Sequence, residues 1–340
     1  MWAINRVATN WLKTNTLQRI YTKEGSVRVT GPFLLFNFFM KTKISIALCL
    51  LAAMAQAQNA NPIKEPVYGS VATALAASRP ATQLNLRDQG VFHLPEQLGT
   101  LQQLHFLNLM GNNLELLEDD VFKLKQLEVL TVKLNALRYL PKSIGNLNKL
   151  INFDATDNSI AYVPSEIGKL TKLRFLHLSY NAITALPNTI GNCKALEVLA
   201  VDNNQLSFLP QEISKLKKIK NFNLSYNQFN EFDAQWTKFP ALEELNIEFN
   251  HIKELPQSIG DLKSLKSVFF NNNRLVALPD GFTQLANLQL LSLANNNIKE
   301  MPKNISKLTE LRTLILTGNP ITPAEKQRLK LELPNCKIYF

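Results

Sequence analysis

The sequence is poor in cysteine, with three in 340 residues. Cys49 lies in an apolar stretch near the N-terminus, which leaves Cys193 and Cys336 in the remainder. In the repeat described below, these two fall in the fifth unit and after the eleventh, so layers about 4.8 Å apart separate them by tens of Å. Disulfides need Cα atoms much closer than that, and we expect no disulfide framework. Export without disulfides is more typical of a bacterial protein than of an animal ectodomain.

The sequence also lacks the short motifs that mark catalytic and metal sites. It contains no HExxH, no CxxC, no phosphate-binding glycine loop and no nucleophile elbow. The four histidines occupy four different positions of the repeat in four different units: His93, His105, His177 and His251. We therefore expect a protein that is not an enzyme and that needs no metal or cofactor.

No apolar run near the N-terminus is long enough to span a membrane. The run from Ile44 to Ala55 has 12 residues, whereas a spanning helix needs about 20. It follows Lys41 and Lys43 and ends at Ala55-Gln56-Ala57, which is the layout of a signal peptide with a small-residue cleavage site. We interpret 40–57 as a cleaved signal peptide and expect an exported protein, periplasmic, cell-surface or secreted, with no transmembrane segment in the mature chain.

Residues 1–39 precede that signal and contain five basic residues against one acid, Glu24. We interpret them as a leader upstream of a true start at Met40. An organelle transit peptide is the alternative, because the segment is basic, contains threonine and is poor in acids. If residues 40–57 are not a signal peptide, the protein is cytoplasmic.

The leader also explains most of the positive charge. Of the formal net charge of +10, residues 1–57 contribute seven of the 37 basic residues and one of the 27 acidic residues. The rest of the chain is therefore close to neutral. A strongly basic protein suggests nucleic acid as a partner, but here the excess lies in a segment that we expect to be removed, and we expect no nucleic-acid binding.

From Ala81 onward the sequence repeats every 23 residues without an insertion. The pattern is LxxLxLxxNxLxxLPxxIGxLxx, as in "LRFLHLSYNAITALPNTIGNCKA" at 173–195. Ten complete units and an eleventh strand occupy 81–318. Self-similarity at such a period predicts a solenoid in which stacked units share one core.

Each position of the unit has a physical role. Apolar residues at positions 4 and 6 alternate with polar ones, which predicts a strand with one buried face. Proline at position 15 removes a donor on the outer arc, where no sheet is needed. Position 9 is a carboxamide that can satisfy backbone groups where each coil turns, and we expect it to be structural. These asparagines are Asn112, Asn135, Asn158, Asn181, Asn204, Asn227, Asn250, Asn273, Asn296 and Asn319.

The register and the LPxxIGxL segment resemble the 23-residue class of leucine-rich repeat proteins, similar to the Ras-suppressor and plant intracellular Ras-group proteins and to exported bacterial members. The resemblance covers residues 81–340. It implies an α/β solenoid, a horseshoe with a parallel β-sheet on the concave face and short helices and turns on the convex face. It does not imply one particular function.

The ends of the solenoid must cover apolar faces. Residues 58–80 are predicted to form a linker, extended over 58–67, followed by a short N-terminal cap helix within 68–78. Residues 319–340 are predicted to form a C-terminal cap that begins with Pro320 and Pro323, continues as a helix to about Leu331 and closes on "KIYF". We expect a monomer.

Two units depart from the consensus. The second has Glu118 at the proline position and Phe122 at the glycine position, and the seventh has Phe229, Phe232, Trp236 and Phe239 in place of smaller residues. We interpret the large rings as core repacking; the alternative is a bulge in the outer arc that forms a second contact.

Positions 3, 5 and 7 are predicted to face outward from the strands, with position 8 on the rim. Most are small or polar, and Asp154 and Lys133 lie among them. Aromatic side chains beside charges of one sign are typical of a binding hot spot. The candidate contact residues for a partner are Phe175, His177, Tyr180, Asp202, Tyr226, Glu244, Glu248, Phe249 and Phe269.

Three functions fit these features. The first is a non-catalytic interaction module that binds a protein or peptide ligand on the concave sheet. The second is an adhesive or structural envelope protein that binds glycan or an anionic surface through lysines of the convex face. The third, which follows from the resemblance alone and requires the cytoplasmic alternative, is a regulator of a small GTPase.

Overall fold

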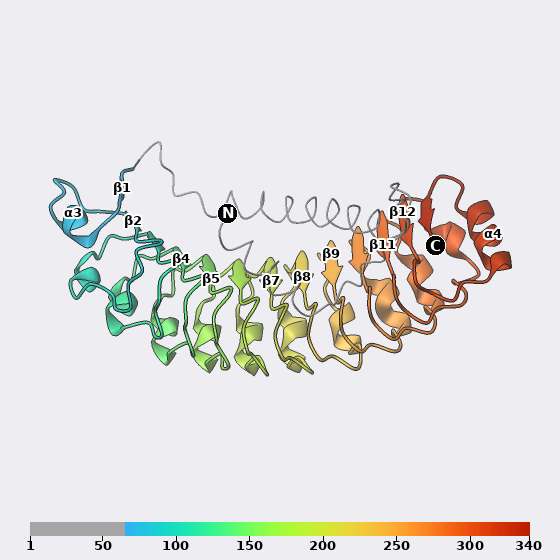
Figure 1. Cartoon of the computed structure of the whole chain (residues 1–340), viewed down its shortest axis with the longest axis horizontal. Coiled ribbons are helices and arrows are strands. Elements are labelled where there is room, and N and C mark those ends of the chain that lie inside the picture. The colour runs from blue at the N-terminus through green and yellow to red at the C-terminus, as the bar shows by residue number, and fades with distance from the viewer. Residues whose placement is uncertain (1–64) are drawn as a thin grey trace, which may run out of the picture. The chain divides into compact units, whose positions relative to one another are not determined.

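Thirteen parallel strands form one sheet in strict chain order, which confirms the predicted solenoid. The structure is a computed structural model that describes residues 65–340. The leader, the signal peptide and residues 58–64 of the linker lie outside this part. The strands lie on one side of the solenoid, here called the strand face, and short 3-10 turns lie on the other (Figure 1). The strands are β1 (Val67–Tyr68), β2 (Gln83–Asn85), β3 (Phe106–Asn108), β4 (Val129–Thr131), β5 (Asn152–Asp154), β6 (Phe175–His177), β7 (Val198–Ala200), β8 (Asn221–Asn223), β9 (Glu244–Asn246), β10 (Ser267–Phe269), β11 (Leu290–Ser292), β12 (Thr313–Ile315) and β13 (Lys337–Tyr339).

The 23-residue register places equivalent residues beside one another. Leu176 of β6 pairs with Leu199 of β7, and both side chains are fully buried at position 4. Leu178, at position 6, is buried in the same way. No layer could bury these side chains alone, so the core is one continuous column that runs through all the units.

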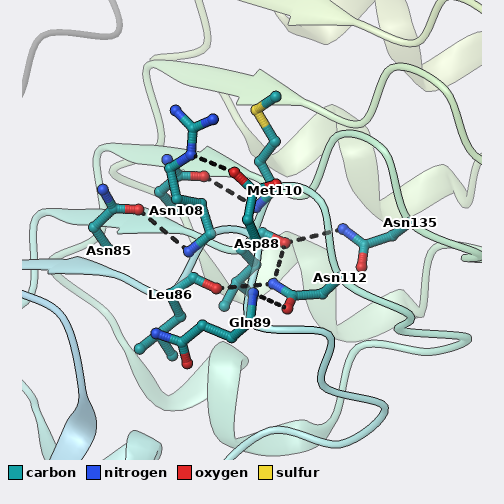
Figure 2. Close-up of polar contacts among 10 residues, drawn as sticks. Asn85, Leu86, Asp88, Gln89, Asn108, Met110, Asn112 and Asn135 are labelled. Carbon is teal, nitrogen blue, oxygen red and sulfur yellow. Dashed lines mark hydrogen bonds and ion pairs between the residues drawn. The ribbon is translucent and has the colours of Figure 1, made fainter. Parts of the chain in front are cut away.

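The asparagine column connects the layers where each strand ends. The Asn112 amide nitrogen donates to the carbonyl oxygens of Leu86 and Leu109, both at 2.9 Å (Figure 2). Its side-chain oxygen accepts the backbone N–H of Gln89 at 3.1 Å. The same amide therefore satisfies backbone groups in its own layer and in the preceding one, and the pattern recurs down to Asn319, which donates to Leu293 and accepts from Ile298.

The outer arc of each unit is a 3-10 turn. Proline precedes six of these turns, with φ between −72° and −65°. Glycine follows in several because the layers approach closely: a Cβ on Gly191 would lie 2.4 Å from the carbonyl oxygen of Glu212 in the next layer. The turns are Leu98–Thr100, Asp119–Lys123, Lys142–Asn146, Ser165–Lys169, Asn188–Asn192, Gln211–Lys215, Ala234–Thr237, Gln257–Asp261, Asp280–Gln284 and Ile305–Lys307.

Both ends of the solenoid carry one more strand than the sequence indicates. The cap helix α3 (Val71–Leu75) is capped by Ser70, and β1 comes before it and pairs with β2. At the C-terminus, α4 (Pro323–Glu332) is capped by Thr322, and β13 then pairs with β12. The end of the predicted linker is thus part of the sheet, and the terminal "KIYF" closes it.

The aromatic residues of the seventh unit lie in the core. Phe229 and Trp236 meet edge to face with ring centroids 5.2 Å apart, and Phe232 contacts Trp236 at 5.0 Å. All three are buried. Phe122 of the second unit is also buried, within a 3-10 turn of the usual length. Larger rings therefore replace the aliphatic core of these layers.

Candidate binding surface

The predicted contact residues come from five consecutive layers, the fifth to the ninth. Phe175 and His177 lie on β6, Glu244 on β9 and Phe269 on β10. The remaining five follow their strands at positions 7 and 8: Tyr180, Asp202, Tyr226, Glu248 and Phe249. Tyr226 and Phe249 are in direct contact, whereas His177 and Phe269 are buried.

Position 8 has a left-handed backbone in every layer. Its φ lies between 52° and 59° at the nine residues other than glycine, and the two glycines, Gly111 and Gly318, have φ of 71° and 79°. This conformation is costly for a residue with a large side chain and cheap for glycine and asparagine. The first, fourth, sixth, ninth and tenth layers have Asp or Asn there. Tyr180, Tyr226 and Phe249 are the aromatic residues in this conformation.

Two of these rings form a stack on the rim of the strand face. Tyr226 and Phe249 have ring centroids 4.1 Å apart and planes inclined by 13°. Each is 38% exposed, and Tyr180, two layers before Tyr226, is 56% exposed. Asn203 occupies the layer between the two tyrosines. We call Tyr180, Asn203, Tyr226 and Phe249 the rim cluster.

Asp202 lies beneath the rim cluster and is held by three side chains. Its carboxylate accepts from the Ser179 hydroxyl, from the Asn203 amide at 2.9 Å and from the Asn223 amide at 2.9 Å. These bonds join the fifth, sixth and seventh layers. They fix the carboxylate next to Tyr180, whose pKa is raised by burial and then by Asp202 and Asp157.

His177 lies between carboxylates but is not their counter-ion. It is 6% exposed and pairs in register with Asp154 of β5. Burial lowers the pKa of its imidazole, although Asp154 and Asp202 act in the opposite direction. The ring is therefore neutral at neutral pH. Asp154 is itself buried, and its Oδ2 has no hydrogen-bond partner among the described residues.

The other predicted contact residues offer less surface. Phe269 is 7% exposed, and Phe175 is half-buried with the Arg174 guanidinium 5.1 Å from its ring centroid. Burial raises the pKa of Glu244, and Glu248 accepts from the Asn271 amide. The exposed part of the predicted surface is thus the rim, and the carboxylates lie beside it.

Sequence reasoning missed two members of this surface. Both are at position 8. The Asn203 amide donates a hydrogen bond to Asp202, and Asp157 is exposed beside Tyr180. A signal was present, because the recurrence of Asp, Asn and Gly at position 8 is typical of a left-handed residue. An aromatic residue in that column could have been recognised as costly.

The lysines of the convex face are partly engaged in local contacts. Lys123 pairs with Asp120, Lys125 donates to the Phe122 carbonyl at 2.8 Å, and Lys217 donates to the Lys238 carbonyl at 3.0 Å. These three are among the convex-face lysines through which the second predicted function would bind glycan or an anionic surface. The full set is Lys123, Lys125, Lys169, Lys172, Lys194, Lys215, Lys217 and Lys218.

Within residues 65–340, no group of three or more His, Cys, Asp or Glu side chains is arranged to hold a metal ion. In the same part of the chain, no helix has the length and apolar character needed to cross a membrane. Cys193 and Cys336 are both free thiols.

Comparison with known families identifies the repeat. A model described as a leucine-rich repeat region matches residues 152–248, and a leucine-rich repeat model matches 240–298 and 263–321. This chain is a leucine-rich repeat protein. Proteins of this kind are in general non-catalytic binding modules. A search of curated proteins finds no match to this leucine-rich repeat protein.

Solved structures share the fold. The plant peptide hormone receptor RGFR1, in complex with RGF2, has 27% identity and a TM-score of 0.66 over 76% of this chain and 43% of its own. The internalin InlF of Listeria monocytogenes has 20% identity and a TM-score of 0.63 over 76% of this chain and 80% of its own. InlJ from Listeria monocytogenes has 19% identity and a TM-score of 0.64 over 76% of this chain and 52% of its own. This leucine-rich repeat protein therefore spans less than half of the plant receptor, and the two internalins show the fold alone.

Proposed function

We propose that this leucine-rich repeat protein binds an extended peptide, or an extended segment of a protein, on its strand face, with the rim cluster as the main contact. The observation that supports this most is the Tyr226–Phe249 stack. Two large rings remain more than one third exposed and have a backbone conformation that disfavours them. Rings of this kind, surrounded by small polar side chains, are typical of interface hot spots.

The shape of the strand face supports an extended ligand. The strands β2 to β13 are three residues long and repeat at the spacing of a parallel sheet, so equivalent side chains form continuous rows across many layers. A ligand that follows such a row can contact several layers at once. The plant receptor with 27% identity was solved with a peptide hormone, which is consistent with a peptide as ligand.

We further propose that the protein is exported. The support is the Met40–Gln58 stretch, with its two lysines, its apolar run and its small-residue site. The N-terminal sequence and intact mass of the natively expressed protein test this proposal. A terminus at Gln58 outside the cytoplasm agrees with it, and an intact chain from Met1 in the cytoplasm contradicts it.

The binding proposal can be tested with a displayed library of random dodecapeptides selected on the purified protein. Selected peptides are then measured by fluorescence polarisation against the double variant Tyr226→Asn/Phe249→Asn. Asparagine is the residue already present at this position in other layers, so the backbone is preserved. We expect at least tenfold weaker binding to the double variant, since buried aromatic hot spots contribute about 2 kcal/mol or more.

Two controls separate the rim from other surfaces. Tyr162→Asn removes an exposed tyrosine elsewhere on the solenoid and should leave binding unchanged. A triple variant, Lys172→Ala/Lys194→Ala/Lys218→Ala, removes exposed charge from the convex face. Selection of no peptide, equal binding to the double variant, or loss only in the triple lysine variant would each overturn the proposal.

A further inference from the structure

We propose that the ligand of the rim cluster is basic, and that a Lys or Arg side chain of the ligand lies above Asn203, between Tyr180 and Tyr226, with the carboxylates of Asp157 and Asp202 beside it. This inference rests on the proposed binding function and specifies its ligand chemistry. It follows from the arrangement of the rings, the sign of the charge around them and the shortage of bases at positions 3, 5 and 7 in units two to eleven.

Asn203 lies in the layer between the two exposed tyrosines of the rim cluster. Phe249 covers one face of the Tyr226 ring, because the two planes are nearly parallel at 4.1 Å. The other face of the Tyr226 ring is directed toward the preceding layers, first the layer of Asn203 and then the layer of Tyr180. Tyr180 and Tyr226 are two layers apart, a separation of about 10 Å along the sheet. Asn203 is the shorter side chain in the layer between them and hydrogen-bonds Tyr180, and we place the cationic group of the ligand above it.

The charge around this position is negative. Asp157 precedes Tyr180 by one layer and is exposed, and Asp202 is fixed below by Ser179, Asn203 and Asn223. On the far side, the pKa of the Tyr226 phenol is raised to about 12 by burial and, to a smaller extent, by Glu248 and Tyr180. Both phenols therefore stay protonated and lie close to carboxylates.

Lys133 is the base of the strand face whose charge reaches this region, where it acts on His177 from the third unit. His177 is neutral, as argued above, and Asp154 keeps an unpartnered buried oxygen. In units two to eleven, Lys133 is the one Lys or Arg at positions 3, 5 and 7 of the strand face, and it lies in the third unit. A cationic ligand would supply the missing charge, whereas an acidic ligand would be repelled.

Aromatic faces and carboxylates together favour a cation over a neutral group. A guanidinium or ammonium over a tyrosine face gains about 0.5–1 kcal/mol at an exposed site and about 2 kcal/mol when desolvated. The buried Asp202 carboxylate already accepts three hydrogen bonds and attracts such a group by its charge, whereas the exposed Asp157 carboxylate can pair with it directly. The same arrangement gives an apolar ligand the rings alone.

The test uses three labelled peptides: fluorescein-Gly-Arg-Ala-Arg-Ala-Arg-Gly and the matched peptides with Gln or Glu in place of Arg. Binding to the purified full chain is measured by fluorescence polarisation at low and moderate salt. We expect the Arg peptide to bind at least tenfold more tightly than the Gln peptide and the Glu peptide to bind least. The affinity for the Arg peptide should fall as salt rises.

Variants locate the binding site. Tyr180→Asn and Asp157→Asn each keep a residue that tolerates the left-handed backbone, and each should weaken the Arg peptide about fivefold or more. Asp261→Asn removes an exposed carboxylate from an outer turn and controls for general charge. Thermal unfolding of each variant checks that it folds. An equal affinity for the Arg and Gln peptides, or equal losses in Asp157→Asn and Asp261→Asn, would overturn the inference.

The outcomes also separate this inference from the proposed function. If library peptides require Tyr226 and Phe249 but show no enrichment in Lys or Arg, the binding function stands and the basic ligand is wrong. If no peptide depends on the rim cluster, both are wrong.

Discussion

Replacement of Asn227 by alanine tests how much the asparagine column stabilises the solenoid. The Asn227 amide nitrogen donates to the carbonyl oxygens of Val201 at 3.0 Å and Leu224 at 3.1 Å. Its oxygen accepts the backbone N–H of Leu206 at 2.9 Å. The side chain is buried, so water does not readily replace it.

The size of the loss follows from which groups keep another partner. Val201 still accepts from Asn204, and Leu224 still accepts from Asn250. The Leu206 N–H has no second acceptor among the described residues. One orphaned buried donor costs about 1–3 kcal/mol, and each weakened carbonyl costs about 0.5–1.5 kcal/mol. We expect Asn227→Ala to lower the free energy of unfolding by about 3 kcal/mol.

Urea unfolding followed by far-UV circular dichroism measures this loss. The matched control is Asn230→Ala, because Asn230 is exposed and makes one long bond of 3.3 Å to the Gln228 carbonyl. Its cost should be within about 0.5 kcal/mol. The m-value must be compared, since solenoid layers can unfold in parts. A loss below about 1 kcal/mol at unchanged m-value would refute the account of the column.

Two further predictions concern the outer arc. Gly191→Ala should cost about 1–3 kcal/mol in the same unfolding assay, because the new Cβ would lie 2.4 Å from the Glu212 carbonyl oxygen. The control is Gly69→Ala, whose Cβ meets nothing within 4 Å and which should be neutral. Equal effects of the two substitutions would contradict the close approach of the layers. The Cys193 thiol is fully buried, and burial raises its pKa to about 12, so only about one molecule in 10⁴ carries a thiolate at pH 8. Ellman's reagent should therefore react with Cys193 only after unfolding. Rapid reaction of Cys193 in the native protein would contradict this burial.

The solenoid could be predicted from the sequence because every layer repeats the same physical task. Leucine at positions 4 and 6, asparagine at position 9 and proline at position 15 recur at one spacing, and a single register places them all. The C-terminal helix was predicted within the cap, and the structure shows what starts it, since Thr322 caps it and Pro323 is its first residue. The strand β1 was missed because two residues have no period, and only the unpaired edge of β2 makes Val67 and Tyr68 extended.

The candidate surface could be predicted only in part. The columns of the repeat place Tyr180, Tyr226 and Phe249 on the rim, and the structure places them there with exposed rings. The stack between Tyr226 and Phe249 and the burial of His177 and Phe269 depend on how neighbouring side chains pack. The amino acids found at one position of the repeat do not reveal that packing, because the position is then considered in each layer separately.

The left-handed backbone at position 8 explains how the scaffold and the recognition surface can vary separately. Tyr226 donates its N–H to the Glu248 carbonyl at 2.8 Å, and its own carbonyl accepts from the Asn204 N–H at 3.2 Å. These bonds belong to the backbone of adjacent layers, so they impose the conformation whatever the side chain is. A residue other than Gly, Asn or Asp then costs about 1–2 kcal/mol. Leu134 shows that a single exception is tolerated. Three aromatic exceptions in the fifth, seventh and eighth layers sum to a cost that ligand contact would offset. Binding should therefore fall, while stability is kept or rises, when they become asparagine.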